Sequence, residues 1–209
     1  VAASGGHGAT TVAATIYLAA KHGIRLMATG GLGGVHLDGE NSLDISADLF
    51  ELQRSPVAVV CCGVKSILDQ ERTMEKLETL GVPVIGYGCR TLPAFYTAES
   101  NIEIPGVDDL DALVSVLRSH RALGMPGGVV IAVPPPKSHA LDLGEVGRLV
   151  DAARNDAARQ DIQGPAQTPF MLRHMALASE GRTVTLNRHL AAANASLAGN
   201  IAARLSQSS

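Results

Sequence analysis

Residues 57–65 read Val-Ala-Val-Val-Cys-Cys-Gly-Val-Lys, and this stretch decides the fold class of the chain. It opens with a continuous apolar run rich in β-branched valine, which is typical of a strand buried on both faces of a parallel sheet. Gly63 interrupts the run. Lys65 then stands just before Ser66, where the pattern of Ser66 with Asp69 three residues later predicts a helix start. The stretch therefore predicts a buried strand that leads into a helix.

Strand and helix patterns alternate on both sides of this stretch. Before it we expect a helix over 10–21, a strand over 24–28 and a short helix with Ile45, Leu49 and Leu52 on one side; after it, a strand over 82–87, a helix over 108–121 and a strand over 129–133. Such alternation favours a three-layer α/β sandwich with a mostly parallel sheet, because parallel strands need long crossover connections. From Leu143 onward only helical patterns occur, so we expect C-terminal helices packed on or across the sheet.

Composition excludes several classes of partner. With 46% hydrophobic and 18% charged residues, residues 1–209 can bury the core of a single α/β domain. A net charge of -3 and an aromatic content of 3% argue against nucleic-acid binding and favour a small-molecule substrate. The apolar runs are too short to cross a bilayer, so no membrane partner is expected. Three cysteines cannot all pair within the chain, which suits a reducing, cytoplasmic location.

Lys65 is the most informative single residue. Desolvation beside a buried strand and the positive end of a helix dipole would both disfavour its ammonium form, so that the free amine could attack a carbonyl. An imine-forming (Schiff-base) lysine needs that state. The alternative is a lysine that extends its head group into solvent at a strand end, or that only contacts phosphate.

Asp44-Ile45-Ser46-Ala47-Asp48 is a second candidate site. Residues four apart share one helix face, so the two carboxylates would lie side by side and repel each other. A hard cation such as Mn²⁺ or Mg²⁺ would relieve that repulsion. The alternative is that Asp44 caps the helix and Asp48 is a solvated surface residue.

Two glycine-rich loops are a weaker signal. Residues 5–8, before the first expected helix, could bring backbone N–H groups to an anion, although turn formation alone would explain them. Residues 30–34 form the second loop, and His36 follows it as a possible acid or base near the carboxyl edge of the sheet, where open α/β sheets bind ligands. An isolated histidine in a loop is also often structural or solvated.

Several long blocks, taken together, resemble the pseudouridine-5'-phosphate glycosidase family in order and spacing. The blocks are residues 4–12, 28–36, 44–48, 57–69 and 81–88, and the similarity continues through 93–96, 168–170 and the last helix from Leu186. The resemblance implies reversible cleavage of pseudouridine 5'-phosphate into uracil and ribose 5-phosphate, a step in pseudouridine catabolism. It also implies one Mn²⁺ per subunit, a homotrimer and a functional link to a pseudouridine kinase.

The resemblance also implies roles for single residues. Lys65 matches the lysine that attacks C1' and forms an imine adduct, and His36 matches an active-site histidine. Asp44 matches the metal ligand. Matches to substrate contacts are Val12, Ser46, Ala47, Asp48 and, less closely, Asn187.

The N-terminal third of the family, with a glutamate taken as proton donor and a lysine that contacts substrate, has no counterpart before Val1. We therefore expect an N-terminally incomplete domain with impaired activity and exposed apolar surface that favours self-association. Two other readings stay open at this point. One is a truncated, non-catalytic homologue that serves only as an oligomer subunit, and the other is a Rossmann-like oxidoreductase that uses its glycine loops for a dinucleotide.

Overall fold

A five-stranded parallel sheet organises the chain. The structure is a computed structural model that describes residues 4–207, except for the side chains at positions 40, 41 and 165. The strands lie in the order β1-β3-β7-β5-β6, and each neighbouring pair is parallel. Their bounds are β1 (Leu26–Ala28), β3 (Ala58–Cys61), β5 (Val84–Tyr87), β6 (Gly106–Val107) and β7 (Val130–Ala132). The run at 57–62 is thus the second strand of the sheet, buried at every position of β3.

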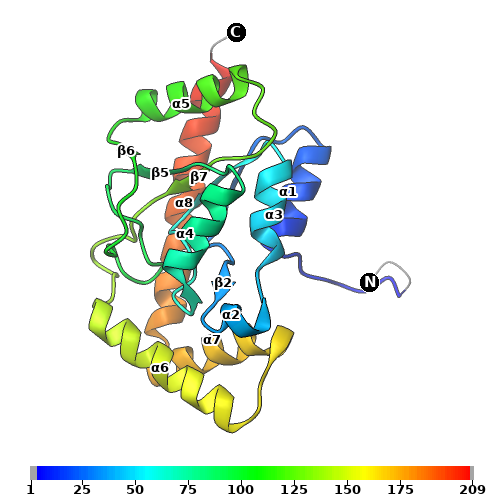
Figure 1. The fold of residues 1–209 in the computed structure, drawn as a ribbon. Coiled ribbons are helices and arrows are strands. Elements are labelled where there is room, and N and C mark those ends of the chain that lie inside the picture. Colours follow the sequence, from blue (N-terminus) through cyan, green and yellow to red (C-terminus); the bar gives the residue numbers. More distant parts are fainter. Residues whose placement is uncertain (1–3, 208–209) are drawn as a thin grey trace.

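Helices cover both faces of this sheet (Figure 1). On one face lie α1 (Val12–Lys21), α3 (Ala47–Arg54) and α4 (Gln70–Thr79), and on the other lie α5 (Leu110–Ala122) and α8 (Arg182–Ser206). Because side chains alternate along a strand, Val59 packs with the first set of helices and Val60 with the second. The predicted α/β sandwich is confirmed.

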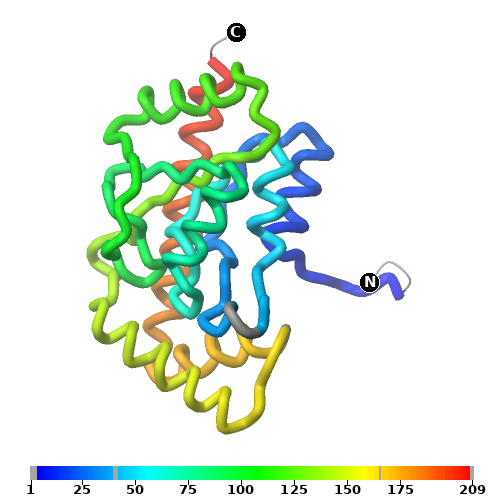
Figure 2. The backbone as a smooth tube through the Cα atoms, viewed as in Figure 1, coloured from blue at the N-terminus to red at the C-terminus, as the bar shows by residue number. Residues whose placement is uncertain are grey.

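The remaining C-terminal helices form a third core at one end of the molecule. The helix α6 (Leu143–Arg159) packs against α7 (Gln167–Ala178), and the short 3-10 helix η1 (Gly164–Ala166) joins them. Figure 2 shows this pair at the end opposite α5, with the backbone of α8 running from it along the sheet. The core here combines Val150 and Met175 with Cys62 and Leu190, so the C-terminal helices pack both on and across the sheet, as predicted.

The first turns of two helices differ from the prediction. The short helix α2 (Gly39–Ser42) precedes α3, which begins after its N-cap Ser46, so Ile45 lies before the helix and not on it. The helix α4 begins after Asp69, whose side chain accepts a hydrogen bond from the Arg72 N–H, so Ser66 is not the cap. Ser66 instead donates its hydroxyl to the Ala94 carbonyl oxygen, at 2.7 Å.

A small second sheet was not predicted. Strands β2 (Val35–His36) and β4 (Leu68–Asp69) pair in antiparallel fashion, with His36 opposite Leu68. This pairing joins the segment after the second glycine loop to the segment after Lys65. It therefore fixes how these two stretches lie relative to each other.

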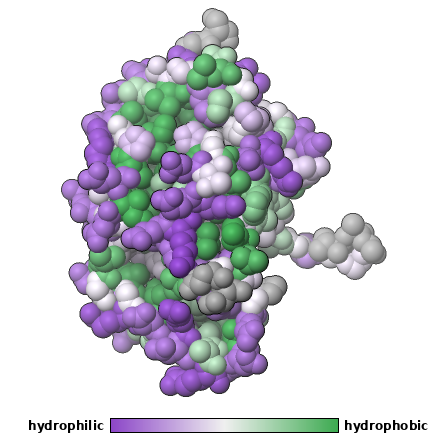
Figure 3. Space-filling view, viewed as in Figure 1, coloured by the Kyte–Doolittle hydropathy of each residue, from purple (hydrophilic) through white to green (hydrophobic). Residues whose placement is uncertain are grey.

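The surface is mixed. On the side seen in Figure 3, apolar residues show as interrupted patches between hydrophilic ones. The exposed large apolar side chains include Leu43, Leu123 and Leu177. Among residues 4–207, no helix has both the length and the apolar composition needed to span a membrane.

Candidate active site

Lys65 lies on a pair of loops that are tied together through their backbones. We call residues 30–34 and 62–65 the lysine platform. The Cys62 N–H donates to the Gly30 oxygen at 2.9 Å, the Leu32 N–H to the Gly63 oxygen at 3.0 Å, and the Lys65 N–H to the Leu32 oxygen at 3.0 Å. The side chains of Leu32 and Val64, both within the platform, are buried. The loops thus extend the parallel pairing beyond the carboxyl ends of β1 and β3.

Gly63 is required by this arrangement. Its φ is +76°, and a Cβ at this position would collide with the carbonyl oxygen of Pro93. Only glycine adopts such a conformation without strain. The chain can therefore turn from β3 towards Lys65 only at a residue without a side chain.

The neighbouring thiols are poor competitors for the role of nucleophile. Burial raises the pKa of Cys61 to about 12 and that of Cys62 to about 11. Both groups stay protonated near neutral pH, whereas the reactive form of cysteine is the thiolate. Lys65 is half-buried, and within residues 4–207 its amine forms no ion pair. The helix-dipole part of the prediction is wrong, because α4 begins at Gln70 rather than at Ser66.

Asp48 is a buried carboxylate whose two oxygens are both engaged by backbone. Oδ1 accepts from the Ala13 N–H at 2.7 Å and Oδ2 from the Gly33 N–H at 2.8 Å. The side chain thus joins α1, α3 and the lysine platform. An anion at the start of α1 also satisfies one of the N–H groups that a helix leaves unpaired there.

Asp44 does not share a helix face with Asp48. It lies before α3, since Ser46 caps that helix by accepting from the Asp48 N–H at 3.2 Å. The alternative, with Asp44 as cap and Asp48 in solvent, is also wrong, because Asp48 is only 4% exposed. The two carboxylates therefore lie in different surroundings. Asp48 binds backbone N–H groups, whereas Asp44 lines a cavity.

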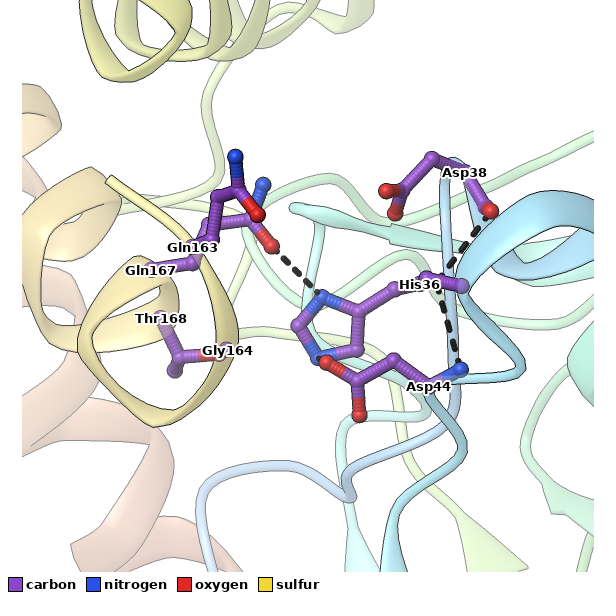
Figure 4. A pocket seen from close by; sticks show the side chains of 8 residues that line it. His36, Asp38, Asp44, Gln163, Gly164, Gln167 and Thr168 are labelled. Carbon is purple, nitrogen blue, oxygen red and sulfur yellow. Dashed lines mark hydrogen bonds and ion pairs between the residues drawn. The ribbon is translucent and has the colours of Figure 1, made fainter. Parts of the chain in front are cut away.

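That cavity, of about 450 Å³, lies between the β2–α2 segment and the start of α7. Figure 4 shows the His36 ring between Gln167 on one side and Asp44 on the other. The Nδ1 atom of His36 lies 3.2 Å from Oε1 of Gln167, and its Nε2 atom lies 3.7 Å from Oδ2 of Asp44. His36 is 14% exposed and Asp44 39% exposed, so the carboxylate is the group that faces solvent. The lining residues are His36, Asp38, Ser42, Asp44, Gln163, Gly164, Gln167 and Thr168.

The other predicted residues surround the platform rather than line this cavity. Val12 opens α1 beside Ala13, and Ala47 opens α3 as an exposed residue. Asn187 of α8 overlies the glycine loop, since its Oδ1 would lie 2.6 Å from a Cβ at Gly30. Lys65 itself is not among the lining residues, but His36 pairs with Leu68, whose N–H donates to the Lys65 oxygen at 3.0 Å. The cavity and the platform are thus linked through the β2–β4 pair.

The first glycine loop, residues 5–8, is part of neither the cavity nor the lysine platform. Residues 4–11 are all exposed and extend away from the body of the molecule (Figure 1). Thr11 caps α1 by accepting from the Ala14 N–H, so this stretch serves as an entry to that helix.

The glutamine wall of the cavity was missed in the sequence. Gln167 lies 131 residues after His36, and neither it nor Gln163 carries a motif of its own. Of the four cavity residues at or near the start of α7, namely Gln163, Gly164, Gln167 and Thr168, only Thr168 falls within a block that resembles the family. That residues 163–168 face His36 becomes visible only in the structure, where α6 packs on α7.

The carboxylates of the cavity, Asp38 and Asp44, are its strongest donors for a metal ion. Within the described residues, no group of three His, Cys, Asp or Glu side chains is arranged to hold one. A small hard cation that keeps several waters needs only one or two carboxylates, together with phosphate oxygens of a substrate. Asp44, with Asp38 on the same cavity, fits that kind of binding.

Comparisons with known proteins identify the family. The model of the family described as "Indigoidine synthase A like protein" matches residues 1–204. Proteins named "Pseudouridine-5'-phosphate glycosidase" from Methylobacterium nodulans, Hahella chejuensis and Herpetosiphon aurantiacus are 45%, 44% and 46% identical over 97%, 97% and 99% of the chain. The chain belongs to the pseudouridine-5'-phosphate glycosidase family. It spans 60%, 67% and 68% of the length of these three relatives.

Solved structures agree with this family assignment. The prealnumycin C-glycosynthase AlnA in complex with ribulose 5-phosphate matches with a TM-score of 0.91 at 38% identity, over 98% of this chain and 68% of that one. An indigoidine synthase A-like protein, TM1464 from Thermotoga maritima, matches with a TM-score of 0.85 at 33% identity, over 94% of this chain and 64% of that one. The pseudouridine-5'-phosphate glycosidase fold thus also occurs in a protein named as a C-glycosynthase.

Proposed function

We propose that this chain carries the imine-forming half of a pseudouridine-5'-phosphate glycosidase, which reversibly cleaves pseudouridine 5'-phosphate into uracil and ribose 5-phosphate. One observation supports it above the others: Lys65 forms no ion pair within residues 4–207, whereas burial keeps the neighbouring thiols of Cys61 and Cys62 protonated near neutral pH. A cavity lined by Asp38 and Asp44 is linked to Lys65 through β4. The names of relatives 44–46% identical point to the same reaction.

The reaction would proceed in steps that balance. The Lys65 amine attacks C1' of the ribose, the C1'–O4' bond breaks, and O4' takes a proton. The C1'–C5 bond to the base then breaks, its electron pair stays on C5 of uracil, and C5 takes a proton while nitrogen forms the imine. Water hydrolyses the imine to ribose 5-phosphate and the free amine. A carbon leaving group is poor, so covalent and acid catalysis together replace a slow direct hydrolysis.

Other residues would bind and orient the substrate. His36 is proposed as an acid or base at the cavity, held through Nδ1 by Gln167. Asp44 would hold Mn²⁺, which when bound would neutralise charge at the phosphate end. Substrate contacts are proposed for Val12, Ser46, Ala47 and Asn187. Asp48 is proposed as a further substrate contact, and each of its carboxylate oxygens also accepts one backbone N–H, from Ala13 and from Gly33.

The assembly and setting follow from the same proposal. We expect a homotrimer in the cytoplasm, where the three free cysteines would stay reduced, and a functional link to a kinase that supplies the phosphorylated nucleoside. Size-exclusion chromatography with light scattering would test the trimer directly.

The decisive test is to trap the imine. The protein is incubated with ribose 5-phosphate, reduced with borohydride and analysed by mass spectrometry. We expect a single adduct on Lys65 that is absent from Lys65→Ala and unaffected in Lys21→Ala, an exposed lysine at the end of α1. Labelling of Lys21 or of other lysines at the level of Lys65 would contradict the proposal. A parallel incubation with NAD tests the oxidoreductase reading, which requires dinucleotide binding and no sugar adduct.

A further inference from the structure

A buried asparagine on the last helix contacts both loops of the lysine platform at the residues where they begin. Asn194 lies in the middle of α8 and is fully buried. Its Nδ2 donates to the Thr29 carbonyl oxygen at 2.8 Å, and the Cys62 thiol lies 3.7 Å from its Oδ1. A buried polar side chain destabilises the folded protein unless its hydrogen bonds are made. The partners of Asn194 lie in segments that follow two strands of the sheet.

The two partners of Asn194 stand at the entrances of the two platform loops. Thr29 directly precedes Gly30 and follows β1, and Cys62 follows β3 and directly precedes Gly63. The Thr29 N–H donates to the Val60 oxygen at 3.0 Å, so both loops begin where the paired strands end. One side chain from α8 therefore fixes both entrances at once.

The same face of α8 carries the predicted substrate contact. Asn187 lies about two turns before Asn194 on this helix, with Leu190 between them buried on the same side. A movement of α8 relative to the strands would thus change the position of Asn187 relative to Lys65.

We propose that Asn194 is a positioning residue for the reaction: it sets the place of Lys65 and of the glycine loop without touching the substrate. This inference rests on the proposed function for its catalytic part. The claim that Asn194 fixes the position of the platform loops does not depend on the proposed function. Misplacement of a reacting group by about 1 Å can cost about 10²-fold in rate, and this is the scale of the effect expected here.

The first measurement is hydrogen exchange, which needs no activity. In Asn194→Leu, which removes both bonds, we expect the amides of Leu32, Cys62 and Lys65 to exchange at least about tenfold faster than in the parent protein. The matched control is Ile201→Ala, at a fully buried position on the same helix that packs with α5. It should lower the melting temperature while these three amides keep their protection. Asn194→Ser leaves a small polar group that cannot reach Thr29, and it carries the test if Asn194→Leu does not fold.

The second measurement is the rate of borohydride trapping of ribose 5-phosphate on Lys65. We expect a fall of about 10²-fold in the folded Asn194 variant and no comparable fall in Ile201→Ala at the same fraction folded. Unchanged exchange at the platform amides, or equal effects of the two substitutions, would overturn the inference. If the parent protein forms no adduct, the proposed function fails, and the exchange result alone decides whether Asn194 holds the platform.

Discussion

The lysine platform and the cavity wall beside it are built in opposite ways. The platform is held by backbone hydrogen bonds between residues 30–34 and 62–65, and its Leu32 and Val64 side chains are buried. The cavity wall is made of polar side chains from two distant segments, with Asp44 39% exposed and a single 3.2 Å contact between His36 and Gln167. A covalent nucleophile must sit at a fixed place, whereas residues that meet a hydrated cation or a phosphate need open space. The difference fits the roles proposed for Lys65 and Asp44.

The largest effect should come from forcing a side chain into the platform. Gly63→Ala adds a Cβ at φ +76° against the Pro93 oxygen, so strain and overpacking together should lower the free energy of unfolding by about 2–5 kcal/mol. Urea denaturation measures this loss. The matched change is Gly147→Ala in α6, where a Cβ meets nothing within 4 Å and should raise stability by up to about 1 kcal/mol. A mild effect of Gly63→Ala would mean that the platform yields easily.

On the cavity wall, changes should affect metal response rather than folding. Asp44→Ala should lower uracil release by about 10–100-fold, and added Mn²⁺ should not restore it. Its melting temperature should change little because the carboxylate is partly exposed. Titration calorimetry with Mn²⁺ on the parent protein, Asp44→Ala and Asp38→Ala compares the two carboxylates without relying on activity. Manganese-stimulated turnover in Asp44→Ala would argue that the cation binds elsewhere.

Asp48 tests whether a carboxylate near the site belongs to the platform. Asp48→Asn replaces one acceptor by an NH₂ group that faces a backbone N–H, so the variant should lose about 1–3 kcal/mol of stability. Asp151→Asn, at an exposed position on α6, should stay within about 0.5 kcal/mol of the parent protein. Thermal unfolding of both variants gives the comparison. Equal stability of the two would show that the Ala13 and Gly33 contacts contribute nothing.

The smallest effect should come from a carboxylate that belongs to neither region. Burial alone would raise the pKa of Glu51, but hydrogen bonds from Arg54 and Ser55 outweigh it and lower the pKa below its usual 4.5. A lowered folded-state pKa gives stability that is present above the unfolded value and is lost as pH falls through the folded one. Glu51→Gln should therefore cost up to about 1 kcal/mol at pH 7, since the Arg54 partner is largely exposed. The difference from the parent protein should shrink below pH 4.5, as followed by urea denaturation across pH. If the stability difference between Glu51→Gln and the parent protein grew on acidification, the folded protein would not lower the pKa of Glu51.

The sequence predicted the platform better than the cavity, for a physical reason. Runs such as 57–62 and 129–133 mark buried strands through local composition, and the glycines between them mark the loops. By contrast, β2 and β4 have two residues each and exist only because they pair with each other, so no periodicity announces them. The four-residue spacing of Asp44 and Asp48 predicts a shared helix face, but the helix begins only after Ser46, which lies between them. Gln163 and Gln167 meet His36 only through the packing of helices that lie far along the chain.

The bond from Asn194 to Thr29 spans 165 residues of sequence. During synthesis the N-terminal strands emerge first, while α8 follows every strand of the sheet. Contacts of such long range are also slow to form, because the entropy of closing the loop must be overcome before the contact contributes. The sheet and its flanking helices can begin to assemble as the chain grows. The loop that carries Lys65 should reach its final shape only when the last helix docks, so a reactive amine would be completed late in folding.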